Sequence, residues 1–220
     1  MTFISVIIAA GGTGKRFKSI KGKQLFPLKN IPILVRTVNK FKDIADEIII
    51  TADKKILQSV KKTFKRYKVV LGGKERSESI KNGLKVLSPK ATIVLVHDGA
   101  RPLVSIKIIK NVISAAKKDG AAVPSVLVKD TIKMSGPKKY VRKTINRSML
   151  YSIQTPQGFK KEILVKAYKG NVKGATDDAY LVEKLGYKVK IVEGDYSNIK
   201  ITTPEDILIA ETILKRENRA

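Results

Sequence analysis

Two glycine clusters and one acidic turn contain the residues most able to do chemistry in this chain. The first cluster spans residues 9–16 (AAGGTGKR) and the second is the pair Gly72-Gly73; each follows an apolar run. Glycines in such turns let backbone N–H groups close around phosphate oxygens. The acidic turn, residues 97–102 (HDGARP), places Asp98 after a third apolar run. Taken alone, Asp98 could equally cap a helix, but beside two glycine loops it is predicted to hold Mg²⁺, which takes carboxylate and phosphate oxygens together.

The first glycine cluster matches neither of the two most familiar nucleotide loops. A P-loop requires glycine where Ala9 stands and Ser or Thr where Arg16 stands. The dinucleotide fingerprint requires a small residue at Phe17 and an acid some 20 residues later, whereas the first acid of the chain is Asp43. The cluster is therefore interpreted as a phosphate loop of another kind, and a plain strand-to-helix turn with solvated lysines remains the alternative.

Strands and helices alternate along most of the chain, which positions these loops. Short runs rich in β-branched residues predict buried strands at residues 3–9, 47–51, 68–71, 92–96 and 188–192, with another beginning at residue 121. Apolar residues at helical spacing predict helices between them, including a basic one over residues 54–66, one that has Pro32 in its first turn and one capped by Ser105. This alternation predicts an α/β fold: a Rossmann-like, mostly parallel sheet with helices on both faces.

The alternation stops at about residues 127–150, which are polar, basic and compatible with β structure. We expect a hairpin there that protrudes from the domain as a β-arm. The chain length of 220 residues is otherwise that of one domain, at roughly 150 residues per domain, so residues 1–220 are predicted to form a single domain carrying this insertion.

The composition excludes several classes of site. Without cysteine and with a single histidine, His97, the chain has no disulfide scaffold, thiolate zinc site or cysteine nucleophile. Its 45 basic and 19 acidic residues give a net charge of +26, which raises nucleic-acid binding as a rival hypothesis. Aromatic residues are only 6% and tryptophan is absent, which disfavours a specific nucleic-acid partner. No apolar run approaches the roughly 20 residues of a membrane span, so a cytoplasmic protein is expected, with no membrane partner.

A set of motifs in a fixed order resembles the methylerythritol-phosphate cytidylyltransferase family of isoprenoid precursor biosynthesis, from Ile4 to about Glu211. These motifs are residues 9–16 with Lys23-Gln24, residues 72–84 (GGKERSESIKNGL), residues 97–102, Asp130-Thr131-Ile132-Lys133, Arg147 with Leu150, Gln154-Thr155-Pro156-Gln157, Thr176-Asp177-Asp178, and residues 198–202 (NIKIT).

The resemblance implies a nucleotidyltransferase that transfers CMP from CTP to a sugar-alcohol phosphate, methylerythritol 4-phosphate, and releases pyrophosphate, with Mg²⁺ as the cofactor. It also implies a homodimer formed through the β-arm, so that Arg147 can serve the neighbouring subunit's site. Transferred position by position, the catalytic residues would be Arg16, Lys23 and Lys200, and the metal ligand would be Asp98. The CTP site would comprise Ala9, Ala10, Gly11, Gly12, Gly14, Gly73 and Ser79, and the acceptor site Arg101, Thr131, Arg147 and Thr155, with Lys200 holding the acceptor phosphate.

Three positions depart from the family pattern, and some alternatives stay open. Gly22 stands where proline is usual, Gly99 replaces the usual alanine, and Lys74 lies where a small or acidic residue is common. Ribitol-phosphate cytidylyltransferase shares most of the motifs and is the alternative activity.

His97 and the pair Asp177-Asp178, which lie within the motifs, each have two interpretations. His97 is expected to pack and to orient Asp98 rather than to react. The pair Asp177-Asp178 is either a second carboxylate site or, the interpretation we favour, acidic charge at a helix N-terminus.

Overall fold

The computed structural model describes residues 2–11, 17, 23–136 and 139–217, and its centre is one eight-stranded sheet. The strand order is β10-β7-β11-β6-β1-β4-β5, with β12 also paired to β7. Six strands point the same way: β1 (Ile4–Ala10), β4 (Glu47–Ala52), β5 (Lys68–Leu71), β6 (Ile93–Asp98), β7 (Ala121–Leu127) and β12 (Lys190–Glu193). The predicted α/β class with a mostly parallel sheet is confirmed.

Helices cover both faces of this sheet because its central strands are apolar on both sides. Along β1, Val6 and Ile8 pack with α1 (Ile33–Asn39), α2 (Leu57–Thr63) and α4 (Ile106–Asp119). The intervening Ile7 packs on the opposite face with α3 (Arg76–Lys85), α5 (Lys161–Lys169) and α6 (Asp178–Glu183). Successive side chains of a strand alternate between faces, so a continuous apolar run requires cover on both. The last helix, α7 (Glu205–Glu217), packs in a third cluster with Leu28, Leu103 and Ile201.

Two strands inside the sheet run against the others, and the sequence patterns did not predict them. β10 (Tyr151–Ile153) and β11 (Gln157–Lys160) are antiparallel to β7, and β11 lies between β7 and β6. Both are short, and a proline and a glycine, Pro156 and Gly158, interrupt this region, so no apolar periodicity marks it. The insertion places Gln157 beside Val96, one residue before the His97-Asp98 pair.

Two helix boundaries also differ from the predictions. The basic helix extends only over Leu57–Thr63, because the Asp53 side chain accepts a hydrogen bond from the Lys55 N–H and holds a turn before it. Pro32 is the N-cap of α1 rather than a residue of its first turn. Ser105 caps α4 as predicted, accepting from the N–H of Ile108.

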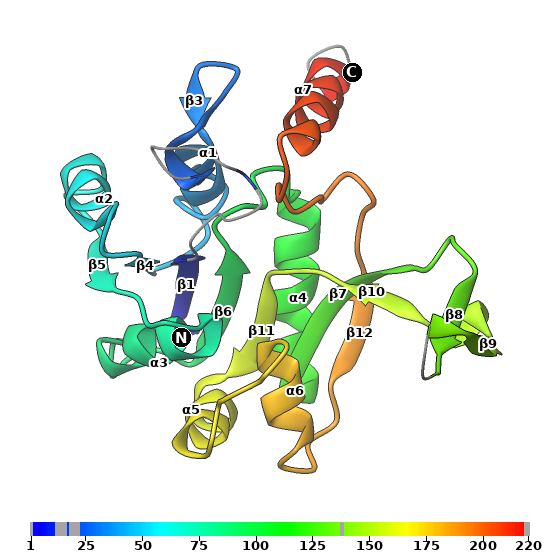
Figure 1. Cartoon of the computed structure of the whole chain (residues 1–220). Coiled ribbons are helices and arrows are strands. Elements are labelled where there is room, and N and C mark those ends of the chain that lie inside the picture. The colour runs from blue at the N-terminus through cyan, green and yellow to red at the C-terminus, as the bar shows by residue number, and fades with distance from the viewer. Residues whose placement is uncertain (1, 12–16, 18–22, 137–138, 218–220) are drawn as a thin grey trace.

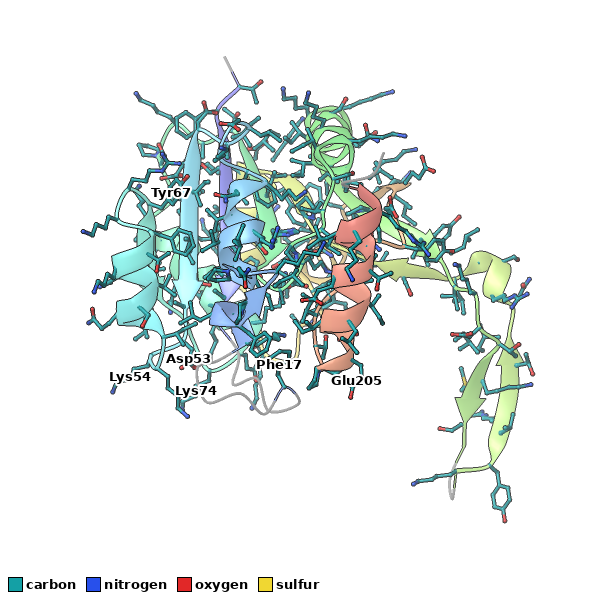
Figure 2. The ribbon with its side chains drawn as sticks, turned by 90° about the horizontal axis from the view of Figure 1, so that it is seen from above. Phe17, Asp53, Lys54, Tyr67, Lys74 and Glu205 are labelled. Atoms are coloured by element: carbon teal, nitrogen blue, oxygen red, sulfur yellow. The ribbon has the colours of Figure 1, made fainter. Side chains whose placement is uncertain are left out.

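The predicted β-arm region contains a separate two-stranded antiparallel sheet, β8 (Ile132–Ser135) with β9 (Val141–Ile145). Figure 1 shows this hairpin beyond the edge of the main sheet, and Figure 2 shows it projecting away from the body of the molecule. Among the helices of the described ranges, none is long and apolar enough to cross a membrane.

Candidate active site

The carboxyl ends of the parallel strands meet at one edge of the sheet, where ligands of open α/β sheets bind. Ala9 of β1 is directly opposite Asp98 of β6, and Ala10 is opposite Ala52 of β4. Figure 2 shows Phe17, Asp53 and Lys74, which follow β1, β4 and β5, along this same edge. The two glycine loops and the acidic turn therefore lie together, as their positions after strands indicated.

The first glycine loop is described only at its two ends. Gly12, Gly14 and Arg16 of the predicted site, and Gly22 among the departures, lie outside the described residues. Lys23 begins the short 3₁₀ helix η1 (Lys23–Leu25), and the side-chain amide of the next residue, Gln24, donates to the carbonyl oxygen of Gly11 at 3.5 Å. The segment that carries Lys23 thus returns to the end of β1.

The two glycine loops meet at Ser79, on the first turns of α3. Its hydroxyl accepts a hydrogen bond from the Gly73 N–H at 3.0 Å and donates to the Glu75 carbonyl oxygen at 3.1 Å. A Cβ atom on Gly11 would lie 3.2 Å from this hydroxyl oxygen, and one on Gly73 would lie 2.2 Å from Cβ of Glu78. Glycine at Gly73 is therefore a steric requirement of the close loop–helix approach, and Gly11 and Gly73, the described glycines of the predicted CTP site, both lie next to Ser79.

Asp98 is surrounded by positive charge. Its Oδ1 accepts from Nε of Arg76 at 3.1 Å, and its Oδ2 lies 3.0 Å from Nζ of Lys200 and 3.3 Å from Nε of Arg101. Burial works to raise the pKa of this carboxyl, but Arg76, Lys200 and Arg101 together hold the pKa well below its usual range. Asp98 is therefore ionised at neutral pH, and the cluster around it retains an excess of cations.

Lys200 and Arg101 come from loops that are tied to each other. Nη1 of Arg101 donates to the carbonyl oxygen of Asn198 at 2.7 Å, and the N–H of Ile201 donates to the carbonyl oxygen of Ala100 at 2.9 Å. Asn198 is fully buried, and its amide donates to the carbonyl oxygen of Thr155 at 3.0 Å. These bonds hold the segment that contains Lys200 next to the end of β6, although Lys200 is about 100 residues from Asp98 in the sequence.

His97 and Thr155 form a hydrogen-bonded chain that ends at the backbone N–H of Asp98. The Thr155 hydroxyl accepts from the Asp98 N–H at 3.1 Å. It donates to Nδ1 of His97, 3.0 Å away, because the neutral ring carries its hydrogen on Nε2, which faces a carbonyl oxygen. The remaining ring nitrogen, Nε2, then donates to the carbonyl oxygen of Arg101 at 3.1 Å. Burial lowers the pKa of His97 to about 3, so the ring is neutral and fully occupied. His97 orients the turn, as expected, and Thr155 does the same.

Arg76 and Asp178 complete the charged cluster. The sequence assigned no site role to Arg76 and left a second carboxylate site as the less favoured interpretation of Asp178. Nη2 of Arg76 donates to Oδ2 of Asp178 at 2.7 Å. Although burial opposes it, Asp178 and Asp98 raise the pKa of Arg76 above its ordinary value. Asp177 is the N-cap of α6 and accepts from the N–H of Tyr180, which is the favoured helix-terminus interpretation, whereas Asp178 belongs to the site. The available signal was an arginine at the start of a helix next to a glycine loop.

The structure does not bring the two remaining acceptor residues to Asp98. Thr131 immediately precedes β8, and Arg147 begins the short helix η3 (Arg147–Met149); both are exposed. The Arg147 guanidinium donates to the carbonyl oxygen of Lys129 within the same arm. Figures 1 and 2 show the arm extending away from the sheet edge that carries Asp98.

The donor set at this edge fits a metal ion that arrives with phosphate. Within the described ranges no group of three or more Asp, Glu or His side chains could hold a metal ion. Asp98 supplies one ionised carboxylate, and Mg²⁺ is commonly bound by one or two carboxylates together with substrate phosphates and water.

Cations that outnumber carboxylates at the end of such a sheet favour substrates that carry phosphates. Nucleotidyltransferases join two such substrates through a phosphate. The fold and the site place this chain in that class. The family model described as 2-C-methyl-D-erythritol 4-phosphate cytidylyltransferase matches residues 4–216. The chain belongs to this family, which confirms the resemblance.

Two proteins of the same name and one solved structure of a differently named synthase are similar to this chain over nearly its full length. The enzyme of Alkaliphilus oremlandii is 44% identical over 229 residues, covering 98% of this chain and 97% of that protein. The enzyme of Clostridium acetobutylicum is 44% identical over 224 residues, covering 96% and 97%. The crystal structure of 4-diphosphocytidyl-2C-methyl-D-erythritol synthase from Anaerococcus prevotii has a TM-score of 0.86 at 35% identity, covering 97% and 99%.

Proposed function

We propose that this protein transfers CMP from CTP to the phosphate of 2-C-methyl-D-erythritol 4-phosphate and releases pyrophosphate. The observation that carries the proposal is Asp98 encircled by Arg76, Arg101 and Lys200, beside two glycine loops, in a chain of this family. The relatives named above carry this activity in their names, which favours methylerythritol phosphate over ribitol phosphate as the acceptor. Because the reaction consumes CTP, we place the enzyme in the cytoplasm.

The acceptor phosphate is the nucleophile, and it needs no general base. The second pKa of a phosphate monoester is about 6, so the group is mostly a dianion at neutral pH. One of its oxygens bonds to the α-phosphorus of CTP, and the bond from that phosphorus to the bridging oxygen breaks, with the electron pair leaving on pyrophosphate. His97 is neutral and has both ring nitrogens engaged, which agrees with a reaction that does not use it as a base.

The barrier to this reaction is electrostatic, because both substrates are anions. We propose that cationic side chains of this protein lower the barrier. Two unit charges about 4 Å apart repel by about 4 kcal/mol at an effective dielectric constant near 20, and both substrates carry several charges. We assign Arg101 and Lys200 to the acceptor phosphate, and Arg16 and Lys23 to the α-phosphate and the leaving pyrophosphate. Fixed cations at these places stabilise charge that develops in the transition state.

The nucleotide and the metal are assigned to the strand ends. The backbone of Ala9, Ala10 and Gly11, continued by Gly12 and Gly14, would bind the CTP phosphates, and Gly73 with Ser79 would line the cytidine pocket. Asp98 would hold Mg²⁺, which supplies charge neutralisation on phosphate oxygens when it is bound.

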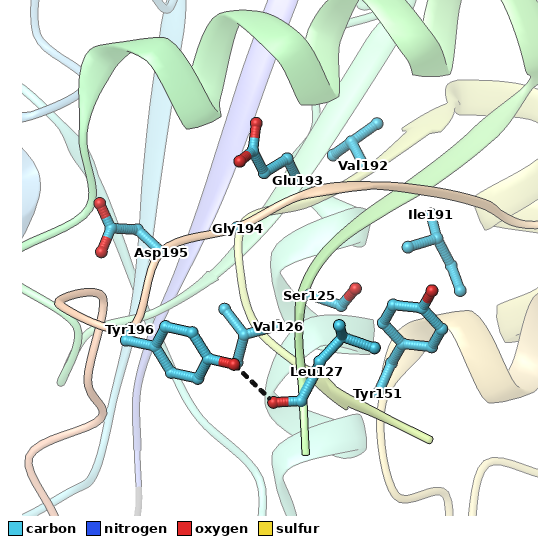
Figure 3. Close-up of a pocket in the computed structure, with 10 residues that line it drawn as sticks. All are labelled: Ser125, Val126, Leu127, Tyr151, Ile191, Val192, Glu193, Gly194, Asp195 and Tyr196. Atoms are coloured by element: carbon cyan, nitrogen blue, oxygen red, sulfur yellow. Dashed lines mark hydrogen bonds between the residues drawn. The ribbon is translucent and has the colours of Figure 1, made fainter. Parts of the chain in front are cut away.

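We propose further that the single domain, residues 1–220, forms a homodimer through its β-arm. Large apolar side chains are exposed on the arm, among them Met134, Tyr140 and Val141, and Tyr140 is 75% exposed. Where the arm leaves the sheet, a pocket of about 580 Å³ is lined by Leu127 and other residues of β7, by Tyr151 of β10 and by residues of β12 (Figure 3). Exposed apolar surface of this kind marks protein–protein contacts.

A second copy of the chain would bring Thr131 and Arg147 to the site that they do not reach in their own subunit. Thr155, whose hydroxyl hydrogen is directed to His97, would then form part of the pocket wall rather than supply the main phosphate contact.

The direct test is pyrophosphate release by the purified protein with CTP and Mg²⁺, comparing methylerythritol phosphate with ribitol phosphate as acceptors. We expect release with methylerythritol phosphate and little with ribitol phosphate. Equal or greater release with ribitol phosphate would assign the alternative activity, and release with neither would refute both.

A further inference from the structure

Asp178 is a fully buried carboxylate in the first turn of α6 to which the proposed reaction assigns no task. Its Oδ2 accepts from Nη2 of Arg76 at 2.7 Å, and its Oδ1 accepts from the Tyr168 hydroxyl at 2.5 Å. Its backbone N–H donates to Oε1 of Gln157 at 3.1 Å. Contacts on both carboxylate oxygens and on the backbone hold this side chain in one orientation.

Arg76 connects this carboxylate to the active site. While Nη2 binds Asp178, Nε donates to Oδ1 of Asp98 at 3.1 Å. A guanidinium is planar and rigid, so anchoring one part of it orients the rest. Asp178 thereby sets the direction from which Arg76 approaches Asp98 and leaves Oδ2 of Asp98 to Lys200 and Arg101.

Stability alone does not account for this arrangement. Buried ion pairs lose solvation, and well-packed apolar side chains of similar volume commonly stabilise a fold as well or better. The orientation that the pair imposes on a third group, the Asp98 carboxylate, is a consequence that apolar packing would not supply. Without Asp178, the whole guanidinium of Arg76 would be available to Asp98 and would compete there with Lys200 and Arg101.

We propose that Asp178 is a positioning residue for cytidylyl transfer, which acts through Arg76 to hold the Asp98 carboxylate in its working orientation. The inference rests on the proposed function, because the task of Asp98 is defined by that reaction. Asp178 lies behind Arg76 and does not itself touch the substrates.

The kinetic test compares Asp178→Asn with the matched control Asp177→Asn. Both remove one carboxylate at the start of α6, but Asp177 binds the N–H of Tyr180 and the amide of Gln157, and not Arg76. We expect Asp178→Asn to lower kcat by about 10²-fold, the scale of a displaced reacting group, with the KM for CTP nearly unchanged. Asp177→Asn is expected to keep kcat close to that of the unaltered protein. Equal losses in the two variants, or full activity of Asp178→Asn, would overturn the inference.

A double substitution separates positioning from general damage. If Asp178 acts only through Arg76, Asp178→Asn should cause no further loss of kcat in an Arg76→Met background. A merely structural role would lower activity by the same factor in both backgrounds, and that result counts against the proposal.

A measurement without turnover keeps the inference distinct from the proposed function. With ¹⁵N-labelled arginine, hydrogen exchange of the Arg76 Nε–H reports its bond to Asp98. This exchange should accelerate at least about tenfold in Asp178→Asn and stay unchanged in Asp177→Asn. Faster exchange with an unaltered protein that releases no pyrophosphate would refute the proposed reaction only, whereas unchanged exchange would refute the positioning role.

Tyr168→Phe is the second variant, should Asp178→Asn fail to fold. It removes one of the two side-chain anchors of Asp178 without changing the packed volume. We expect faster Arg76 exchange and a kcat several-fold lower, and the loss of kcat should be absent in the Arg76→Met background. An unaltered exchange rate and kcat would contradict the proposal.

Discussion

The stability of this protein should fall as the pH is lowered from about 7.5 to about 5, and His97 should account for the change. The His97 side chain is fully buried, and burial lowers its pKa from 6.5 to about 3. Below about pH 6.5 the folded protein therefore binds fewer protons at His97 than the unfolded chain does. The contribution of His97 to stability is fully present above about pH 6.5 and is lost progressively as the pH falls toward about 3. No other histidine titrates in this window, because the chain has only one.

The magnitude follows from the distance between the pH and the unfolded pKa. A pH of about 5 is about 1.5 pH units below the unfolded pKa, so protonation stabilises the unfolded chain. At about 1.36 kcal/mol per unit, the free energy of unfolding falls by about 2 kcal/mol. The value depends little on the folded pKa, since about 3 is already well below this pH. The lowered pKa of Asp98 acts outside the window, because its contribution is lost only as the pH falls below the ordinary value of 3.8.

Urea unfolding at the two pH values measures this difference. With a slope of about 2 kcal/mol per M, the midpoint should be lower by roughly 1 M at about pH 5. His97→Gln is the control: whatever its absolute stability, its midpoint should change little between the two pH values, because the titrating ring is gone. Equal pH dependence in both proteins, or none in the unaltered one, would refute a neutral buried His97.

Three further predictions concern the site. Lys23→Ala should lower kcat by orders of magnitude while the thermal midpoint stays nearly unchanged, because the side chain is assigned to transition-state charge; near-normal turnover would contradict this assignment. Gly73→Ala should destabilise by about 1–3 kcal/mol and weaken CTP binding in calorimetry, because its Cβ would lie 2.2 Å from that of Glu78. Gly136→Ala, where the nearest atom is 3.7 Å away, is the control and should change neither quantity. Arg147→Ala and Lys200→Ala should each be nearly inactive alone, yet an equal mixture after subunit exchange should regain about a quarter of the activity, since half of the dimers would hold one intact site. A mixture that stays inactive would count against an arm shared between subunits.

The parallel strands and the loops at their ends could be predicted from local pattern. The β-branched runs of β1 and β6 are buried on both faces, and this requirement is visible in an apolar run that does not alternate. The predicted runs end at residues 9 and 96, directly before the glycine loop and the acidic turn, so both were expected at one edge of the sheet. Ser105 was recognised as a cap because capping depends on neighbours three residues away.

The antiparallel strand β11 could not be predicted in this way. β11 is held between β6 and β7 by partners that are more than 30 residues distant, and its own residues carry no strand periodicity. Tertiary pairing thus decides structure where local propensity is weak.

What the sequence by itself determined is the fold class, the edge of the sheet where chemistry occurs, and the family motifs that lie there. Only the tertiary structure decided that Arg76 lies between Asp98 and Asp178, 22 and 102 residues away, and that Thr155 lies against His97, 58 residues away. The physical reason is that spacing along a chain determines contacts within one helix or strand, whereas contacts between distant side chains depend on strand order and register. Asp178, which looked like an ordinary helix-start charge, acquires its partner only when α6 packs on the same face of the sheet as α3.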